Sequence, residues 1–129
     1  MTATPARPDL AYTTATRLDP AVLVKELREL LGASLVAYLG GVRETRAVRQ
    51  WAEGTRAISG REDLQRLRVA YQAAKLVAER DDSDVVQAWF QGLNPVLGDR
   101  SPARLLREGA VEDVGPKVLA AARQFAAVG

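Results

Sequence analysis

Arginine is the residue through which this sequence is best equipped for chemistry. Between Arg43 and Arg68 there are seven arginines and four acids, a local charge of +3. A guanidinium group pairs with phosphate oxygens and binds the edge of guanine in a bidentate manner. The stretch therefore indicates binding of a polyanion such as DNA. The alternative is that these arginines are simply solvated on a helical surface.

The sequence lacks the residues that several kinds of catalysis require. The sequence contains no His and no Cys, which excludes Ser-His-Asp and Cys-His catalysis, zinc sites built on imidazole or thiolate, and disulfides. Asp81, Asp82 and Asp84 could offer oxygen ligands to Mg²⁺ or Ca²⁺, but a solvated linker with an N-cap for the next helix is the favoured interpretation. We expect no metal, no cofactor and no enzymatic activity, although carboxylates and arginine alone can act catalytically.

Length and composition limit the architecture. The 129 residues are 47% hydrophobic and 26% charged, with a net charge of +2, which fits one compact domain or two small modules that share a core. No apolar run approaches the roughly 20 residues needed to span a bilayer, and the first residues lack a basic segment followed by an apolar stretch, so we expect a protein that is not exported. We expect a cytoplasmic protein without a membrane contact. Pro5 and Pro8, with no apolar period around them, predict a disordered tail over residues 1–18.

Apolar residues recur at helical spacing along the rest of the chain, and no β-alternation of convincing length appears. The predicted fold class is all-α with about seven helices. Asp19-Pro20 and Ser101-Pro102 are helix start signals, and Gly32 and Gly109 are stop signals. The expected helices cover residues 20–31, 34–39, 43–52, 61–80, about 85–90, 102–108, and a last segment that begins near 111 or afresh at 116.

The long helix over 61–80 is apolar on two sides. One stripe contains Leu67 and Tyr71, and the other, nearly opposite, contains Ala73 and Val77. A helix that is apolar on two sides is buried on two sides. It therefore either separates and joins two groups of helices or uses its second face as a dimer seam, which is one of two hints of a homodimer.

The two short helices on either side of Gly40-Gly41 have the form of a helix-turn-helix. DNA reading requires exposed polar groups near the start of the second helix, and such proteins commonly dock as two-fold dimers. Helical spacing places Trp51 on the core side of that helix with Ala47 and Val48, and places Arg46 on the outer flank. The candidate DNA-binding residues are Arg43, Thr45, Arg46, Arg49, Gln50 and Arg56.

The second half has a distinctive order of elements: a Trp-containing helix, a loop with Asn and Leu, a short Ser-Pro-capped helix that ends in Leu and Gly, and a final helix. The residues that define it are Trp89, Asn94, Leu97, Ser101, Pro102, Leu105 and Gly109. With the preceding helix-turn-helix, this pattern resembles the Xre/MbcA/ParS-type antitoxins over roughly Pro20 to Val128.

The resemblance implies a bacterial antitoxin that binds a RES-domain toxin, an NAD-consuming enzyme, and blocks its active site, while the helix-turn-helix autoregulates the operon. It implies a helix-turn-helix module at 19–60, a long connecting helix at 61–82 and a toxin-binding domain at 83–129. Most of the motif residues are expected to hold the shape of that domain. The candidate toxin contacts are the neighbouring Arg104, Arg107, Lys117 and Arg123.

Charge distribution suits two different partners, because Asp81 to Gly129 holds five bases and seven acids, a net of −2, in contrast to the basic stretch before it. The alternative function is a stand-alone helix-turn-helix transcription regulator whose C-terminal helices serve dimerisation or effector sensing.

Overall fold

The computed structural model describes residues 16–128, and within them the fold is all-helical with no strand, as the sequence predicts. The predicted disordered tail falls mostly on residues 1–15, which lie outside the described part of the chain. Between residues 18 and 128 of the described part, the seven α-helices are α2 (Pro20–Leu31), α3 (Ala33–Leu39), α4 (Thr45–Glu53), α5 (Arg61–Ala78), α6 (Ser83–Gln91), α7 (Pro102–Glu108) and α8 (Val111–Val128), with the 3₁₀ turn η1 (Pro95–Leu97) between α6 and α7.

Side-chain caps start three of these helices where the sequence signals them. Asp19 accepts a hydrogen bond from the Ala21 N–H at 3.1 Å with Pro20 in the first turn of α2, and Ser101 Oγ accepts from the Arg104 N–H at 3.1 Å at the start of α7. Asp82 accepts from the Val85 N–H at 3.2 Å and starts α6, so the cap expected within the acidic linker is confirmed. These bonds satisfy backbone donors that a helix start leaves unpaired.

Three predicted helix boundaries are wrong. The helix expected over 43–52 begins at Thr45, because Glu44 has extended backbone angles (φ −111°, ψ 136°) and Arg43 lies before it in the turn. The helix expected from residue 34 begins at Ala33, and α5 ends at Ala78 instead of residue 80. The last helix starts at Val111 and continues through Pro116, which removes the possibility of a fresh start there.

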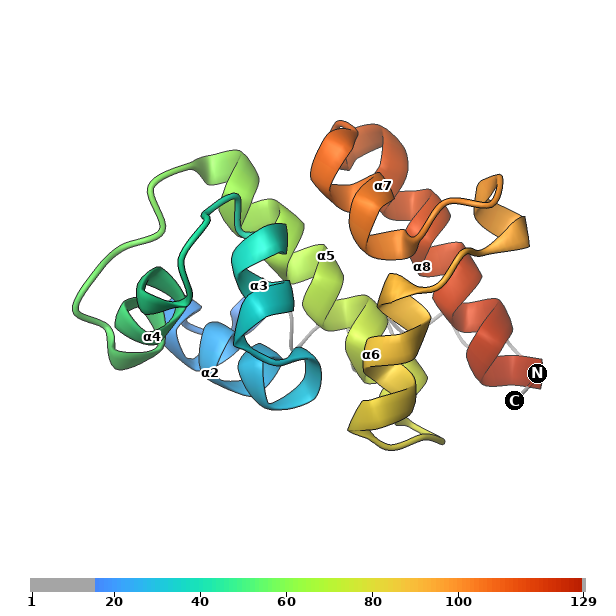
Figure 1. Ribbon diagram of the computed structural model, residues 1–129, viewed down its shortest axis with the longest axis horizontal. Helices are drawn as coiled ribbons and strands as arrows, with labels where there is room; N and C mark the ends of the chain where they lie inside the picture. Colours follow the sequence, from blue (N-terminus) through green and yellow to red (C-terminus); the bar gives the residue numbers. More distant parts are fainter. Residues whose placement is uncertain (1–15, 129) are drawn as a thin grey trace, which may run out of the picture.

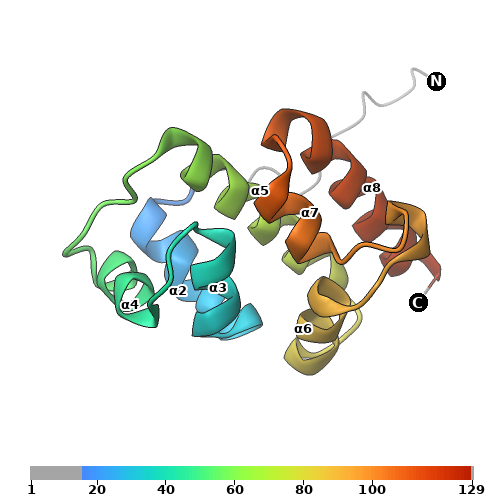
Figure 2. The same ribbon diagram turned by 45° about the horizontal axis from the view of Figure 1, so that its top comes forward.

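The helices form two groups, one on each side of α5 (Figure 1). Helices α2, α3 and α4 pack together on one side, and α6, α7 and α8 on the other, where α8 runs along α5. The turned view in Figure 2 shows the same separation. Both apolar stripes of α5 are thus covered within one chain, so the long helix joins two packed groups and its second stripe is not free to be a dimer seam.

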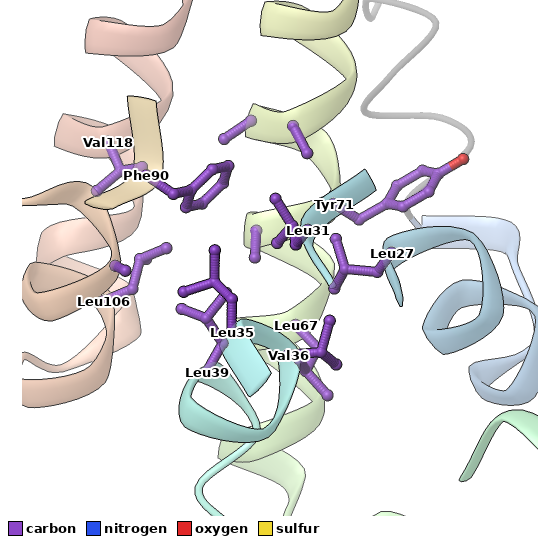
Figure 3. Packing of buried hydrophobic residues seen from close by; sticks show 14 of the residues in the cluster. Leu27, Leu31, Leu35, Val36, Leu39, Leu67, Tyr71, Phe90, Leu106 and Val118 are labelled. Atoms are coloured by element: carbon purple, nitrogen blue, oxygen red, sulfur yellow. The ribbon is translucent and has the colours of Figure 1, made fainter. Parts of the chain in front are cut away.

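A single core runs through both groups. Figure 3 shows Leu27, Leu31 and Leu35 of the first group converging with Leu67 and Tyr71 of α5, while Phe90, Leu106 and Val118 approach from the second. Leu18, within the predicted tail, packs partly against this core, and its carbonyl accepts from Arg68 Nη1 at 2.9 Å. Burial of this apolar surface is the main stabilising contribution to the fold.

Arg66 of α5 links the two groups through hydrogen bonds. Its Nε donates to the Leu106 carbonyl in α7 at 3.1 Å, and its Nη1 donates to the Leu39 carbonyl in α3 at 3.1 Å and to Asp63 Oδ1 at 2.7 Å. Arg66 is only 7% exposed. It therefore belongs to the interior, and it does not add to the surface charge that the basic stretch suggests.

Candidate functional site

The turn between α3 and α4 depends on both of its glycines. A Cβ at Gly40 would lie 2.7 Å from the ring of Trp51, so only glycine allows the turn to approach this side chain. Gly41 has a φ of +80°, a conformation that glycine adopts without strain. The turn seats α4 against α2 and α3 with Ala47, Val48 and Trp51 buried, and Trp51 is a core residue as expected.

Four of the six candidate DNA-binding residues surround one hollow at the start of α4, which we call the cationic hollow. Its volume is about 480 Å³, and it is lined by Val42, Arg43, Glu44, Arg46, Ala47, Gln50 and Arg56. Arg56 Nη1 donates a long hydrogen bond of 3.4 Å to Gln50 Oε1. Three arginines and one acid thus meet here, and the excess of positive charge suits an anionic partner.

The other two candidates lie outside this hollow. Thr45 and Arg49 are exposed on α4 but do not line it, while Arg43, Arg46 and Arg56 are exposed at its rim. Gln50 is half-buried. The predicted set therefore divides into a cluster around the hollow and an exposed face of α4 beside it.

The motif residues of the second half shape the backbone, as expected. Trp89, Leu97 and Leu105 are buried, and Ser101 caps α7 with Pro102 behind it. Asn94 organises the loop: its Oδ1 accepts from the Val96 N–H at 3.0 Å and its carbonyl accepts from the Leu97 and Asp99 N–H groups at 2.9 Å. A Cβ at Gly109 would run into Val114 at the start of α8, so this position requires glycine.

The candidate toxin contacts Arg104 and Arg107 on α7 are exposed and already have partners in the chain. Arg104 Nε donates to Glu108 Oε2 at 3.1 Å, an exposed ion pair that adds little stability. The Arg107 guanidinium lies over the Tyr38 ring of α3, 5.6 Å from its centroid. Arg107 thus bridges the two groups of helices and stays accessible.

Lys117 and Arg123 on α8 are also exposed. They are six positions apart, which separates them by about 120° around a helix of 3.6 residues per turn. The four predicted contacts are therefore spread over α7 and two directions of α8.

An exposed apolar surface near the end of α8 was missed by the sequence reasoning. Leu93 is 77% exposed, Val96 56% and Val128 82%. Val96 and Val128 border a groove of about 280 Å³, which we call the apolar groove and which is lined by Trp89, Asn94, Val96, Ala121, Gln124, Phe125 and Val128. Large apolar side chains grouped at a surface groove commonly mark a binding surface for another protein. The signal in the sequence for this exposed surface was the presence of the apolar residues Leu93 and Val96 next to the Asn94-Pro95 break.

Two further observations concern other kinds of site. In the part of the chain that the structure describes, no three acidic side chains gather closely enough to hold a metal ion. Among the helices of residues 16–128, none is both long and apolar enough to cross a membrane.

The protein belongs to the class of small all-helical proteins in which one helix, here α5, connects two groups of helices. One group contains a helix-turn-helix, and the other contains a short Ser-Pro-capped helix. Among solved structures, a chain of the crystal structure of the M. tuberculosis MbcT–MbcA toxin–antitoxin complex is similar, with a TM-score of 0.61 and 28% sequence identity. The match covers 81% of the present chain and 94% of that chain. It confirms the resemblance to MbcA-like antitoxins that the sequence pattern indicates. No protein-family model and no curated protein matches the sequence significantly.

Proposed function

We propose that this protein is an antitoxin that binds a cognate RES-domain toxin, an NAD-consuming enzyme, and blocks its active site. The observation that carries the proposal is the 28% identity, over 81% of the chain, to a chain from a toxin–antitoxin complex. The order of motif residues from Trp89 to Gly109 supports it independently. In this role the protein acts by shape and surface in the cytoplasm and performs no catalysis itself.

The toxin-binding surface combines the exposed bases of α7 and α8 with the apolar groove. Interfaces between proteins draw most of their affinity from buried apolar and aromatic side chains at the centre, and charged residues at the rim direct association. Val96 and Val128 supply the exposed apolar side chains, and Arg104, Arg107, Lys117 and Arg123 supply exposed positive charge elsewhere on α7 and α8. Binding removes the exposed apolar surface from water.

Coexpression with a RES-domain protein that is encoded next to this chain tests the proposal, which requires such a neighbour. We expect restored growth, preserved cellular NAD and copurification of the two proteins. The matched control is the same toxin with a Leu106→Asp variant of this chain, which disrupts the core and should give no protection. A toxin that stays active and separate in the presence of the folded protein contradicts the antitoxin role.

For the second activity, we propose that α4 binds operator DNA and that the protein autoregulates its operon. The support is the cationic hollow at the start of α4, together with exposed Thr45 and Arg49 on the same helix. Arginines placed in this way pair with phosphates and with guanine edges. The protein binds as a homodimer to two half-sites about 34–36 Å apart, the spacing typical of helix-turn-helix dimers.

The DNA proposal predicts steep salt dependence, because each neutralised phosphate releases counterions. We expect Arg46→Ala with Arg49→Ala to abolish the gel shift on the operon's promoter, while Lys75→Ala, on an exposed part of α5, leaves it unchanged. Light scattering should give twice the mass of the chain. Binding that is unaffected by the double substitution removes α4 from the interface, and a monomeric mass removes the dimer.

The alternative function is a stand-alone helix-turn-helix regulator. It predicts operator binding with no toxin encoded nearby and no complex with any RES-domain protein. The apolar groove with Val96 and Val128 fits both functions, because a regulator could cover it with a second copy or an effector, whereas the 28% identity to a chain of a toxin–antitoxin complex favours the antitoxin.

A further inference from the structure

A homodimer of this chain needs a surface other than the two already described. Both apolar stripes of α5 are covered within the chain, and the apolar groove is proposed to bind the toxin. Another surface lies where the loop after α4 forms one end of the molecule, with the C-terminal end of α8 at the other end (Figure 1). It is a groove of about 280 Å³ between the start of α2 and this loop, and we call it the end groove.

The middle of the end groove is apolar. Its lining is Asp19, Pro20, Ala21, Trp51, Gly54, Arg56, Ala57, Ile58 and Leu64. Trp51 is buried beneath it, whereas Ile58 and Leu64 are half-buried and Ala57 is exposed. Their aliphatic groups therefore leave apolar surface in water, and covering this surface with another protein is favourable.

Asp19 and Arg56 give the end groove one acid and one base. Both are exposed, and within residues 16–128 they form no ion pair with each other or with another side chain. The Asp19 carboxylate accepts from the Ala21 N–H at 3.1 Å, and Arg56 donates a long bond of 3.4 Å to Gln50. A surface with both signs of charge is complementary to a copy of itself, because a two-fold axis sets the acid of each chain against the base of the other.

We propose that the end groove is the interface of the homodimer, an assignment that rests on the proposed dimer and names its surface. The Asp19 carboxylate of each chain pairs with the Arg56 guanidinium of the other, and Ile58 and Leu64 of the two chains pack together at the centre.

The position of this interface suits both proposed activities. Arg56 lines the end groove and the cationic hollow, so the two cationic hollows of the dimer lie beside the interface, where one DNA duplex can reach both. The apolar groove includes Val128 at the end of α8, so the two apolar grooves lie at the far ends of the dimer and stay open to a toxin.

Charge reversal tests the pairing between chains. In a homodimer of Asp19→Arg two bases face each other at each contact, and in a homodimer of Arg56→Asp two acids do. We expect each variant alone to dimerise at least tenfold more weakly than the unaltered protein in sedimentation equilibrium at low salt. An equimolar mixture of the two variants should dimerise again, because both contacts of the mixed dimer join an acid to a base. Pairing within one chain cannot produce this rescue.

Two controls accompany the charge reversal. Asp19 also caps α2, so thermal unfolding checks that each variant is folded. Asp19→Asn keeps a capping side chain and loses only the charge, and we expect its dimer affinity to lie between those of the unaltered protein and Asp19→Arg. An Asp19→Asn protein as weakly dimeric as Asp19→Arg would contradict a role for charge repulsion.

The apolar centre is tested by Ile58→Glu, which places two carboxylates at the two-fold axis. We expect this variant to be monomeric and folded. The matched control is Val96→Glu in the apolar groove, which should leave the dimer intact. A dimeric Ile58→Glu protein together with a monomeric Val96→Glu protein overturns the proposal and makes the apolar groove the dimer surface.

Failure of the interface and failure of the homodimer give different results. A monomeric mass of the unaltered protein at every concentration contradicts the homodimer and the end groove together. A dimeric unaltered protein, with folded charge-reversal variants that dimerise equally well or are not rescued by mixing, overturns the end groove and leaves the homodimer standing.

Discussion

The cationic hollow beside α4 and the apolar groove beside α8 differ in what they leave exposed. Arginines with one acid surround the first, whereas aliphatic and aromatic side chains line the second. Charge at a solvated rim favours a highly charged partner whose binding weakens in salt, and exposed apolar surface favours a partner that excludes water. This small chain therefore presents two chemically distinct surfaces, one on each side of α5.

The largest effect is expected where the two regions are joined. Arg66→Ala removes the bonds to the Leu39 and Leu106 carbonyls and leaves Asp63 without its partner, so we expect the free energy of unfolding to fall by about 3 kcal/mol. Urea unfolding measures it. The control is Arg61→Ala on an exposed position of the same helix, for which we expect a change within about 0.5 kcal/mol. A loss below about 1 kcal/mol for Arg66→Ala would mean that apolar packing alone holds the two groups together.

Alkaline pH probes the contact between α5 and α2. Burial raises the pKa of Tyr71 above its ordinary value near 10. The hydrogen bond to Glu26 and the negative charge of Glu26 raise this pKa further. Its phenol donates to Glu26 Oε1 at 2.8 Å. The folded state holds the phenol proton more tightly than the unfolded state does. The contribution of this group to the free energy of unfolding is therefore complete below pH 10 and is lost as the pH rises above 10.

We therefore expect stability to fall by up to about 1.4 kcal/mol more per pH unit above 10 in the unaltered protein than in Tyr71→Phe. Unfolding curves at pH 8 to 11 for the two proteins give this difference, and other titrating groups cancel in it. Parallel pH profiles would show that in solution the Tyr71 phenol is neither buried nor bonded to Glu26.

Helix capping offers a smaller test of the same two regions. Ser101 caps α7, whereas Glu44, at the N-cap position of α4, makes no side-chain cap bond. We expect Ser101→Ala to cost about 1 kcal/mol and Glu44→Ser to add about 0.5 kcal/mol, since Glu44 already has the extended backbone of a cap. Thermal unfolding measures both. A destabilised Glu44→Ser protein would show that Glu44 has a structural role beyond its backbone.

Much of the fold could be predicted because its signals are local. Asp19-Pro20 and Ser101-Pro102 identify helix starts, and the two stripes of α5 indicate burial on both sides. The start of α4 could not be placed correctly from the sequence. The extended backbone at Glu44 depends on the path of the chain through the Gly40-Gly41 turn, and that path is set by packing against neighbouring segments.

The candidate sites were predictable in part. Helical spacing shows which face of α4 is polar, so the exposure of Arg46 and Arg49 could be predicted. It does not show that Arg66, an arginine like the others, lies in the interior between two groups of helices. Nor does it show that Val96 and Val128 stay uncovered, since an apolar residue in a sequence is ordinarily expected to be buried. Both facts depend on contacts between distant segments.

Two variants measured against two partners show whether the apolar groove and the cationic hollow bind different partners. Val96→Asp and Arg46→Ala are each titrated with the adjacent RES-domain toxin, in a catalytically inactive form, and with the operator. We expect Val96→Asp to weaken toxin binding at least tenfold with operator affinity unchanged, and Arg46→Ala to weaken operator binding about tenfold with toxin affinity unchanged. Toxin affinity that is indifferent to Val96→Asp, with the variant folded, would contradict the assignment of toxin binding to the apolar groove.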